Sequence, residues 1–201
     1  PLVPLAVRRR NRSVEGWSMA RPNILLIVSD QHRWDCSGGV GEYPVRTPHL
    51  DALARTGTRF DAAYTPIPLC VPARQSLLTG VRPEVNGGLW NYDLGPRTTV
   101  LAPDAQAWTR HLSGAGYRSL YVGKWHVHPD ADPTAFGYDE YVPLADYEAF
   151  RAERHPGAEG DGGWFGGVDP VPTAESRTHW SADRAAEFIR RGGDGGPWHG
   201  R

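Results

Sequence analysis

The sequence predicts an α/β protein in which helices flank a central, mostly parallel β-sheet. Residues 23–29 (NILLIVS) contain a continuous run of Ile, Leu and Val, which is typical of a buried central strand. Residues 117–122 (YRSLYV) alternate weakly between apolar and polar side chains and predict a second buried strand. Each run ends in a cluster of polar residues, and open α/β sheets place their functional sites at the carboxyl ends of their strands.

A first helix is predicted soon after the first strand. Thr47 is a suitable N-cap residue, and Pro48 suits the first helical turn. Leu50 and Leu53 supply an apolar face, and Gly57 is a stop signal. Residues 60–64, which follow, predict a short strand.

A second helix is predicted within residues 66–80. Pro72 suits its first turn, Leu77 and Leu78 lie along it, and Gly80 ends it. This arrangement puts Cys70 at or just before the N-terminus of a helix.

The rest of the chain is less regular. An amphipathic helix is expected over 103–113 and a last helix over about 181–191. Residues 81–100 are rich in turn signals, and residues 129–172 are rich in Gly, Pro and Asp and predict loop excursions. No regular structure is predicted for 192–201 from these local signals.

Composition excludes several classes of protein. The 201 residues carry 22 basic and 23 acidic side chains, a net charge of −1, so no basic field favours nucleic acid or a membrane surface. The longest apolar run, 24–28, is too short for a membrane span or a signal-peptide core. Two cysteines do not make a disulfide scaffold. We therefore expect a soluble, cytoplasmic protein with neither a nucleic-acid nor a membrane partner.

Residues 1–18 show no helical or strand period and contain an arginine cluster. We expect this segment to be a non-native or disordered leader, with Met19 as the natural start and 19–201 as the structured region. The alternative is a short basic tail that contacts an acidic partner.

Lys124 is the only lysine, since the other 21 basic residues are arginines. A bias against lysine codons explains the scarcity. A lysine kept despite that bias indicates a position that needs a compact ammonium rather than a planar guanidinium, although chance explains it equally well.

Three segments, taken in chain order, resemble the motifs of one family. They are PNILLIVSDQ (22–31), CVPARQSLLTG (70–80) and GYRSLYVGKWH (116–126). The second of these follows the pattern C-x-P-x-R-x4-TG, and together with the segments at 136–141 and 181–189 it makes the chain similar to the sulfatase family from about residue 21 to 198. The nearest branches by resemblance are bacterial arylsulfatases, choline-sulfatases and phosphonate monoester hydrolases.

The resemblance implies an alkaline-phosphatase-like fold and a specific chemistry. Cys70 would be oxidised by a maturation enzyme to formylglycine, an aldehyde whose hydrate attacks the sulfur of a small sulfate ester. Asp30, Gln31 and the modified Cys70 would hold a divalent cation, most simply Ca²⁺, with Mg²⁺ or Mn²⁺ as alternatives. Arg74, Lys124 and His126 would be the remaining catalytic residues.

The residue types agree with these roles. Carboxylate and amide oxygens suit a hard cation, and the free N–H groups of a helix N-terminus favour an anion beside Cys70. Arg74 lies one turn along the same helix, where it balances negative charge. His126, two residues after Lys124, points to the same side if that segment is extended, and it would exchange a proton there.

Other residues are weaker candidates. Cys36 is expected to be a buried thiol, with a disulfide to Cys70 as the alternative. A structural role is favoured for His32, Arg33 and Trp34 over one at the entrance of the site, while His128 is a minor site candidate and residues 90–92 are a candidate substrate wall. Many sulfatases carry a histidine near the position of Asn86.

Two departures from the family pattern define the alternatives. Gln31 stands where many sulfatases have a second aspartate. This variation resembles the choline-sulfatase and phosphonate monoester hydrolase branches, so phosphodiesters and phosphonates are rival substrates. No Asp-Asn or Asp-His pair follows Lys124 to complete the metal site. The chain therefore resembles the N-terminal part of a sulfatase catalytic domain, with a fold incomplete at its C-terminus. An inactive remnant and a thiol enzyme that uses Cys70 with His126 are the other hypotheses.

Overall fold

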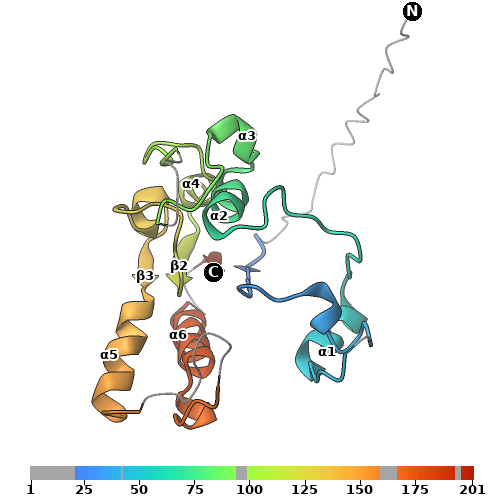
Figure 1. The fold of residues 1–201 in the computed structure, drawn as a ribbon. Helices are drawn as coiled ribbons and strands as arrows, with labels where there is room; N and C mark the ends of the chain where they lie inside the picture. Colours follow the sequence, from blue (N-terminus) through green and yellow to red (C-terminus); the bar gives the residue numbers. More distant parts are fainter. Residues whose placement is uncertain (1–20, 42, 94–98, 159–166, 193–195) are drawn as a thin grey trace, which may run out of the picture.

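A four-stranded parallel sheet forms the centre of the protein in a computed structural model, which describes residues 21–41, 43–93, 99–158, 167–192 and 196–201 (Figure 1). The strand order is β1-β4-β2-β3, and every neighbouring pair is parallel. The strands are β1 (Ile24–Leu25), β2 (Arg118–Val122), β3 (Glu140–Val142) and β4 (Trp198–Gly200). The predicted α/β class with a mostly parallel sheet is confirmed.

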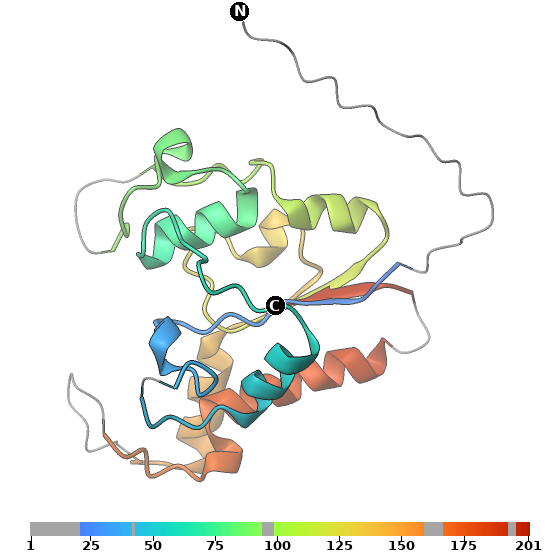
Figure 2. The same ribbon diagram turned by 90° about the vertical axis from the view of Figure 1, so that its right-hand side faces the viewer.

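Helices cover both faces of this sheet (Figure 2). The helices of the described residues are α1 (Pro48–Thr56), α2 (Cys70–Thr79), α3 (Pro83–Asn86), α4 (Trp108–Gly114), α5 (Leu144–Arg154) and α6 (Arg177–Arg191), with short 3-10 helices η1 (Trp34–Cys36), η2 (Pro133–Phe136) and η3 (Thr173–Glu175). The helices α2 and α4 lie on one side of the sheet, and α5 and α6 lie on the other (Figure 2). None of the helices within these ranges has the length and apolarity needed to cross a lipid bilayer.

Alternate residues of β2 build a separate core on each face, because successive side chains of a strand point in opposite directions. Tyr121 packs on the α2 side, in a cluster that includes Leu78, Val127 and Phe136. Leu120 packs on the α6 side. Its cluster is completed by Phe188 and Trp198. The two clusters hold β2 between the helix layers. They thereby also fix the position of the residues that come directly after β2, which include the site residue Lys124.

The predicted limits of two helices are confirmed, although the Thr47 side chain makes no capping hydrogen bond at the start of the first. The helix α1 runs from Pro48 to Thr56, next to Gly57. The helix α2 begins at Cys70 and ends before Gly80, whose φ of 69° lies in the left-handed region that glycine adopts without strain. The prediction that Cys70 stands at a helix start is therefore correct.

The expectation of a buried central strand over 23–29 is wrong. Only Ile24 and Leu25 pair, and they pair with β4 alone, at the edge of the described sheet. One further bond, from Leu26 N to the carbonyl of Gly200, ends the pairing, and the Ile27 side chain is 78% exposed. A continuous apolar run favours a strand with a neighbour on each side, but in the described sheet β1 has a neighbour, β4, on one side alone.

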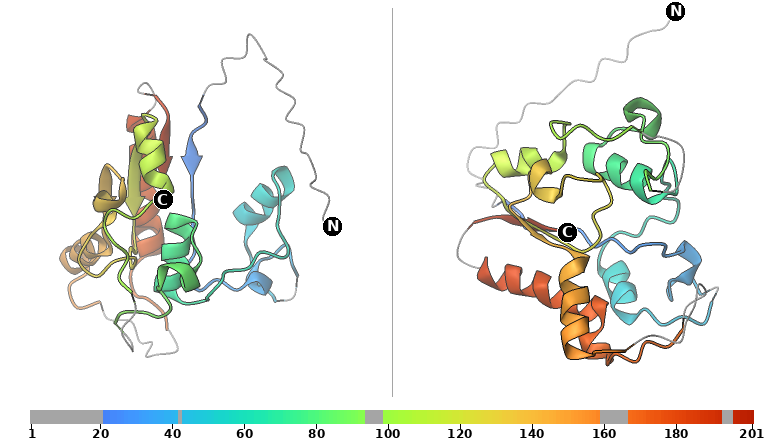
Figure 3. Two further views of the ribbon diagram at one scale, coloured as in Figure 1. Left: turned by 90° about the horizontal axis from the view of Figure 1, so that it is seen from above. Right: turned by 60° about the vertical axis from the view of Figure 1, so that its left-hand side comes forward.

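The short strand expected over 60–64 is not formed. Phe60 is 75% exposed and Tyr64 is 91% exposed, and no described strand lies beside them to accept their backbone groups. This segment leads from α1, which lies away from the sheet in two views (Figures 1 and 3), to the start of α2.

Several other boundaries differ from the expectations. The helix α4 begins at Trp108 rather than at residue 103, and α6 begins at Arg177, where the Ser176 hydroxyl accepts a bond from the backbone N of His179. The loops expected over 129–172 contain β3 and α5, the turns at 81–100 contain α3, and the tail contains β4. The leader predicted at 1–18 and the start at Met19 lie outside the described residues.

Candidate active site

Cys70 is the first residue of α2, and its surroundings are fixed by a buried amide. The Asn91 side chain is 4% exposed, and its Oδ1 accepts a hydrogen bond of 2.9 Å from the backbone N of Val71. One of the otherwise unpaired N–H groups of the helix start is thereby satisfied. Asn91 was expected to form a substrate wall; instead it is buried and positions the turn that carries Cys70.

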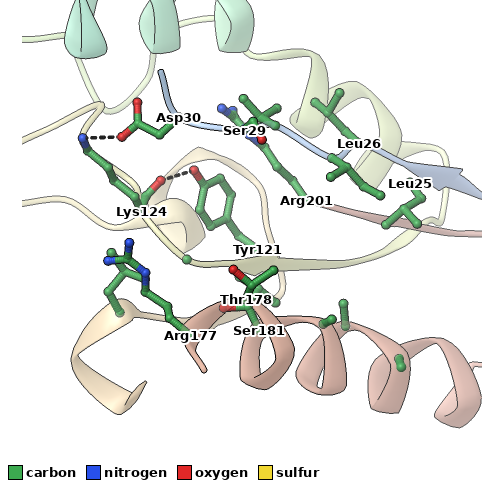
Figure 4. Close-up of a pocket in the computed structure, with 18 of the residues that line it drawn as sticks. Leu25, Leu26, Ser29, Asp30, Tyr121, Lys124, Arg177, Thr178, Ser181 and Arg201 are labelled. Atoms are coloured by element: carbon green, nitrogen blue, oxygen red, sulfur yellow. Dashed lines mark hydrogen bonds and ion pairs between the residues drawn. The ribbon is translucent and has the colours of Figure 1, made fainter. Parts of the chain in front are cut away.

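Lys124 joins Cys70 to Asp30 across three elements. Its Nζ lies 2.8 Å from Asp30 Oδ2 and 3.4 Å from Cys70 Sγ. Asp30 follows β1, Lys124 follows β2, and Cys70 begins α2. Figure 4 shows the bond between Asp30 and Lys124 at one end of a pocket. The sequence prediction that the polar ends of two strands meet at one site is borne out for these side chains by their distances.

The Lys124–Asp30 contact is an ion pair. The hydrogen bond from Lys124 lowers the pKa of the Asp30 carboxyl, and this effect exceeds the opposing effect of partial burial. Partial burial lowers the pKa of the Lys124 ammonium, but the bonds and charges of Asp30 and Cys70 together raise it. Both groups are therefore charged at neutral pH.

Arg74 is buried under this pair and is held by two oxygens. Its Nη1 donates to the carbonyl of Lys124 at 2.7 Å and to the Tyr121 hydroxyl at 3.3 Å, while its Nη2 lies 3.9 Å from Asp30 Oδ2. The Tyr121 hydroxyl donates in turn to the Lys124 carbonyl at 2.5 Å. Burial raises the pKa of Tyr121, so its hydroxyl stays protonated. Tyr121 was missed in the sequence because an aromatic residue inside a predicted strand indicates core packing alone.

The backbone conformation that positions His126 differs from the extended one considered in the sequence analysis. Its φ of 49° lies in the left-handed region, so the segment after Lys124 is not extended and strand alternation does not place the ring. Its Nε2 lies 3.4 Å from Asp93 Oδ1, and its ring packs edge-on against Tyr92 with centroids 5.0 Å apart. Asp93 is a neighbour that no sequence motif indicated.

The electrostatic surroundings keep His126 neutral. Burial lowers the pKa of the imidazole, the nearby Lys124 and Arg74 charges lower it further, and Asp93 opposes them. Its Nδ1 is buried without a hydrogen-bond partner among the described residues. The imidazole is therefore available to accept a proton.

Gln31 follows Asp30 with a φ of 56° and an exposed side chain. Asp30 and Gln31 offer oxygen donors of the kind that Ca²⁺ and Mg²⁺ prefer. The described ranges contain no group of three or more His, Cys, Asp or Glu side chains gathered to hold a metal. The donor chemistry fits a hard cation, and the described residues supply part of the coordination that such an ion takes.

The two cysteines are free thiols, so the alternative of a Cys36–Cys70 disulfide is wrong. Cys36 is half-buried in η1, and its carbonyl is bonded to His32 Nε2 at 3.0 Å. That bond gives His32 a role in the turn, as favoured from the sequence.

Two further side chains are engaged in local turns. The His128 Nδ1 accepts bonds from the backbone N of Asp130 and Ala131, at 3.0 and 2.8 Å. The Asn86 Oδ1 accepts a bond from the Gly88 backbone N. These contacts assign His128 to the loop after β2.

Beside the charged cluster, a pocket with a cavity volume of about 560 Å³ extends between residues 25–30 and α6 (Figure 4). Asp30, Arg74 and Lys124 line one part of it. Arg74, Lys124, Arg177 and Arg201 are the cationic side chains of the lining, and Asp30 is its carboxylate.

Comparisons with known proteins place this site in a family. Residues 22–192 match the family model described as Sulfatase, and the chain belongs to the sulfatase family. It is 37% identical over 189 residues to an uncharacterized sulfatase, YidJ, of Escherichia coli, covering 86% of this chain and 35% of that protein. It is 36% identical over 136 residues to an arylsulfatase of Clostridium perfringens, covering 62% of this chain and 26% of that protein.

The fold is similar to that of solved structures from related enzymes. The phosphonate monoester hydrolase of Agrobacterium radiobacter matches with a TM-score of 0.70 at 26% identity, over 90% of this chain and 40% of that one. The alkaline-phosphatase-like fold expected from the resemblance is thereby confirmed. The chain spans about a quarter to a third of the length of these two curated relatives.

Proposed function

We propose that residues 19–201 are the N-terminal part of a sulfatase catalytic domain that hydrolyses sulfate monoesters by means of a formylglycine made from Cys70. The observation that carries this proposal is the contact of Lys124 with both Cys70 Sγ and Asp30, at a helix start that favours an anion. A maturation enzyme would act on Cys70, whose thiol is partly exposed.

Each side chain has a role that follows from its contacts. In sulfatases the formylglycine supplies the nucleophilic oxygen, and a divalent cation supplies positive charge against the ester. Lys124 provides an ammonium that binds a sulfate oxygen, and Arg74, held by Tyr121 and the Lys124 carbonyl, balances the negative charge behind it. His126, neutral and beside Asp93, accepts a proton during turnover.

Asp30 and Gln31, together with the modified Cys70, would hold the cation. The carboxylate of Asp30 is ionised, which is the state that a metal requires. Ca²⁺ is the first choice because it takes oxygen donors in a variable coordination geometry, with Mg²⁺ and Mn²⁺ as the alternatives.

The test combines mass spectrometry with an assay. The chain, and a longer version completed with the rest of a relative's sequence, are each co-expressed with a formylglycine-generating enzyme, and the peptide that spans Cys70 is weighed. Conversion of the thiol to the aldehyde and hydrolysis of an aryl sulfate are expected for the longer version, and Cys70→Ala abolishes both. A converted, metal-supplemented long version that cleaves no sulfate ester contradicts the proposal.

Hydrolysis of phosphonate or phosphate esters is the second candidate. Gln31 and the similarity to the phosphonate monoester hydrolase fold favour it. Sulfate and phosphate esters are both tetrahedral anions, so a comparison of their turnover by the same matured sample decides between them. An unmodified Cys70 after co-expression supports an inactive remnant instead.

A further inference from the structure

Three consecutive residues, 91–93, contact both the start of α2 and the ring of His126. At the helix start, the Oδ1 of Asn91 accepts the hydrogen bond from the backbone N of Val71. Two residues later, the carboxylate of Asp93 faces the imidazole of His126. One short segment therefore relates the position of the imidazole to the first turn of α2.

The position of the His126 ring depends on contacts from this segment. Its backbone φ of 49° lies in a left-handed region that costs free energy in residues other than glycine, so the surroundings must hold it there. The Tyr92 ring packs edge-on against the imidazole, with centroids 5.0 Å apart. Burial and the charge of Asp93 raise the pKa of Tyr92 to about 12, so Tyr92 stays a neutral phenol and does not act as a base.

The two ring nitrogens of His126 have different surroundings. Nε2 lies 3.4 Å from Asp93 Oδ1, whereas Nδ1 is buried and has no hydrogen-bond partner among the described residues. A carboxylate oxygen is an acceptor, so it attracts an N–H and repels the lone pair of an unprotonated nitrogen. A proton on Nδ1 would be a buried donor without an acceptor in the described part of the chain, and it would turn the Nε2 lone pair towards the carboxylate. Both nitrogens therefore favour the neutral ring with its proton on Nε2.

Charged groups from several elements act on this imidazole. Lys124, which precedes it in the loop after β2, and Arg74 of α2 lower the pKa of His126, and burial lowers it most. Asp30, after β1, is a carboxylate that interacts with the ring at longer range. Among the described residues, Asp93 is the carboxylate within ion-pair distance of it.

We propose that Asp93 is a positioning residue for the proposed reaction: it holds the proton of His126 on Nε2 and thereby makes Nδ1 the nitrogen that accepts a proton. This inference rests on the proposed function, which assigns that proton transfer to His126. After the transfer the imidazolium carries a proton on each nitrogen, and Asp93 is its counter-ion. Because the negative charge stabilises the imidazolium, Asp93 makes His126 a stronger base than burial and the two cations alone allow.

The test is NMR spectroscopy of the unmatured chain with isotopically labelled histidine, because this measurement does not depend on turnover. Correlations between the ring nitrogens and the carbon-bound ring protons identify the neutral tautomer of each of the eight histidines. The signal that is lost in His126→Gln belongs to His126. We expect its proton on Nε2 at neutral pH. A proton on Nδ1 overturns the inference, whether or not the longer version cleaves an aryl sulfate.

Removal of the carboxylate tests its effect on base strength. The Asp93 side chain is 51% exposed, so Asp93→Ala should fold. The pKa of His126 should fall in this variant, since burial and the nearby cations are no longer opposed, and Asp93→Glu should restore it. Asp183→Ala removes an exposed carboxylate of α6, on the opposite side of the sheet from α2 (Figure 2), and is the matched control that should leave the His126 titration unchanged. An unchanged pKa in Asp93→Ala contradicts the inference.

The matured longer version adds a kinetic signature. Asp93→Ala should lower kcat for an aryl sulfate about tenfold, because the imidazole is a weaker base, while KM changes little. The acid limb of the pH profile of kcat/KM should move to lower pH, since His126 then loses its proton at a lower pH. A lower kcat with a raised KM and an unmoved acid limb would assign Asp93 a purely structural role and contradict the inference.

Discussion

The Nζ of Lys124 lies 3.4 Å from the Sγ of Cys70. These residues are separated by 54 positions in the chain, and each stands at the end of an element whose limits are set by a different local signal. The same ammonium contacts Asp30, so one side chain links the helix start to the two strand ends. A ligand anion at this helix start would compete with Asp30 for the ammonium.

Lys124→Met should lower kcat/KM for an aryl sulfate about 100- to 1,000-fold in a matured, active sample, since it removes a charge directed at the ester oxygens. The pKa of the Asp30 carboxyl should rise in the same variant, because its hydrogen bond to Lys124 is lost. Steady-state kinetics and NMR titration of the carboxyl measure the two effects. Arg82→Met, which removes an exposed cation paired with Glu84, should leave both unchanged. Unaltered kinetics in Lys124→Met would exclude the proposed contact with sulfate.

Asn91→Leu should destabilise the fold by about 1–3 kcal/mol, because the backbone N of Val71 would be left buried and unpaired. Asn91→Asp keeps an acceptor oxygen at that position and should retain most of the stability. Urea denaturation measures the free energy of unfolding of both variants. Equal losses in the two would mean that packing around Asn91, rather than its hydrogen bond, fixes the start of α2.

Gly88 approaches the buried Gln75 so closely that a Cβ built there would lie 1.9 Å from Gln75 Oε1. Gln75 has little room to move, since it is 1% exposed and its Nε2 donates to the carbonyl of Val127 at 3.0 Å. Gly88→Ala should therefore cost about 1–3 kcal/mol of unfolding free energy. Gly114→Ala is the matched control: no atom lies within 4 Å of its Cβ position, and it should be neutral or stabilising. A thermal melt that ranks the two variants in the opposite order would contradict this account.

The parts of the site that local signals determine were predictable from the sequence. Pro72 and Gly80 mark the ends of α2 and thereby place Cys70, and the apolar run of β2 places Lys124. The strand β3 was missed because it is three residues long and exists through its pairing with β2, which no local pattern reveals. Non-local pairing is also why the first apolar run became an edge strand.

The missed site residues share a different cause. Tyr121 acts through a hydroxyl that meets Arg74 from another element, and Asp93 meets His126 in the same way. The left-handed backbone conformation of His126 could not be predicted, because the residue is neither a glycine nor an asparagine. Such contacts follow from the packing of elements, so only the structure reveals them.

His199 gives β4 a specific sensitivity to acid. Its side chain is fully buried among the rings of Trp108, Tyr117 and Tyr138, and neither ring nitrogen has a hydrogen-bond partner among the described residues. Burial lowers its pKa from 6.5 to about 4, although the charge of Asp139 opposes the shift. The folded protein therefore keeps His199 neutral at a pH where the unfolded chain protonates it.

The direction of the pH effect follows from proton uptake. Between pH 6.5 and pH 4 the unfolded state binds a proton that the folded state does not, so the free energy of unfolding falls as the pH falls, by about 3 kcal/mol over this range from His199 alone. His199→Leu removes this contribution and should flatten the dependence of the urea midpoint on pH. His111→Leu, at an exposed position of α4, should leave the slope as in the wild type. Parallel pH profiles for the wild type and His199→Leu would show that the buried imidazole does not control the acid stability of the sheet.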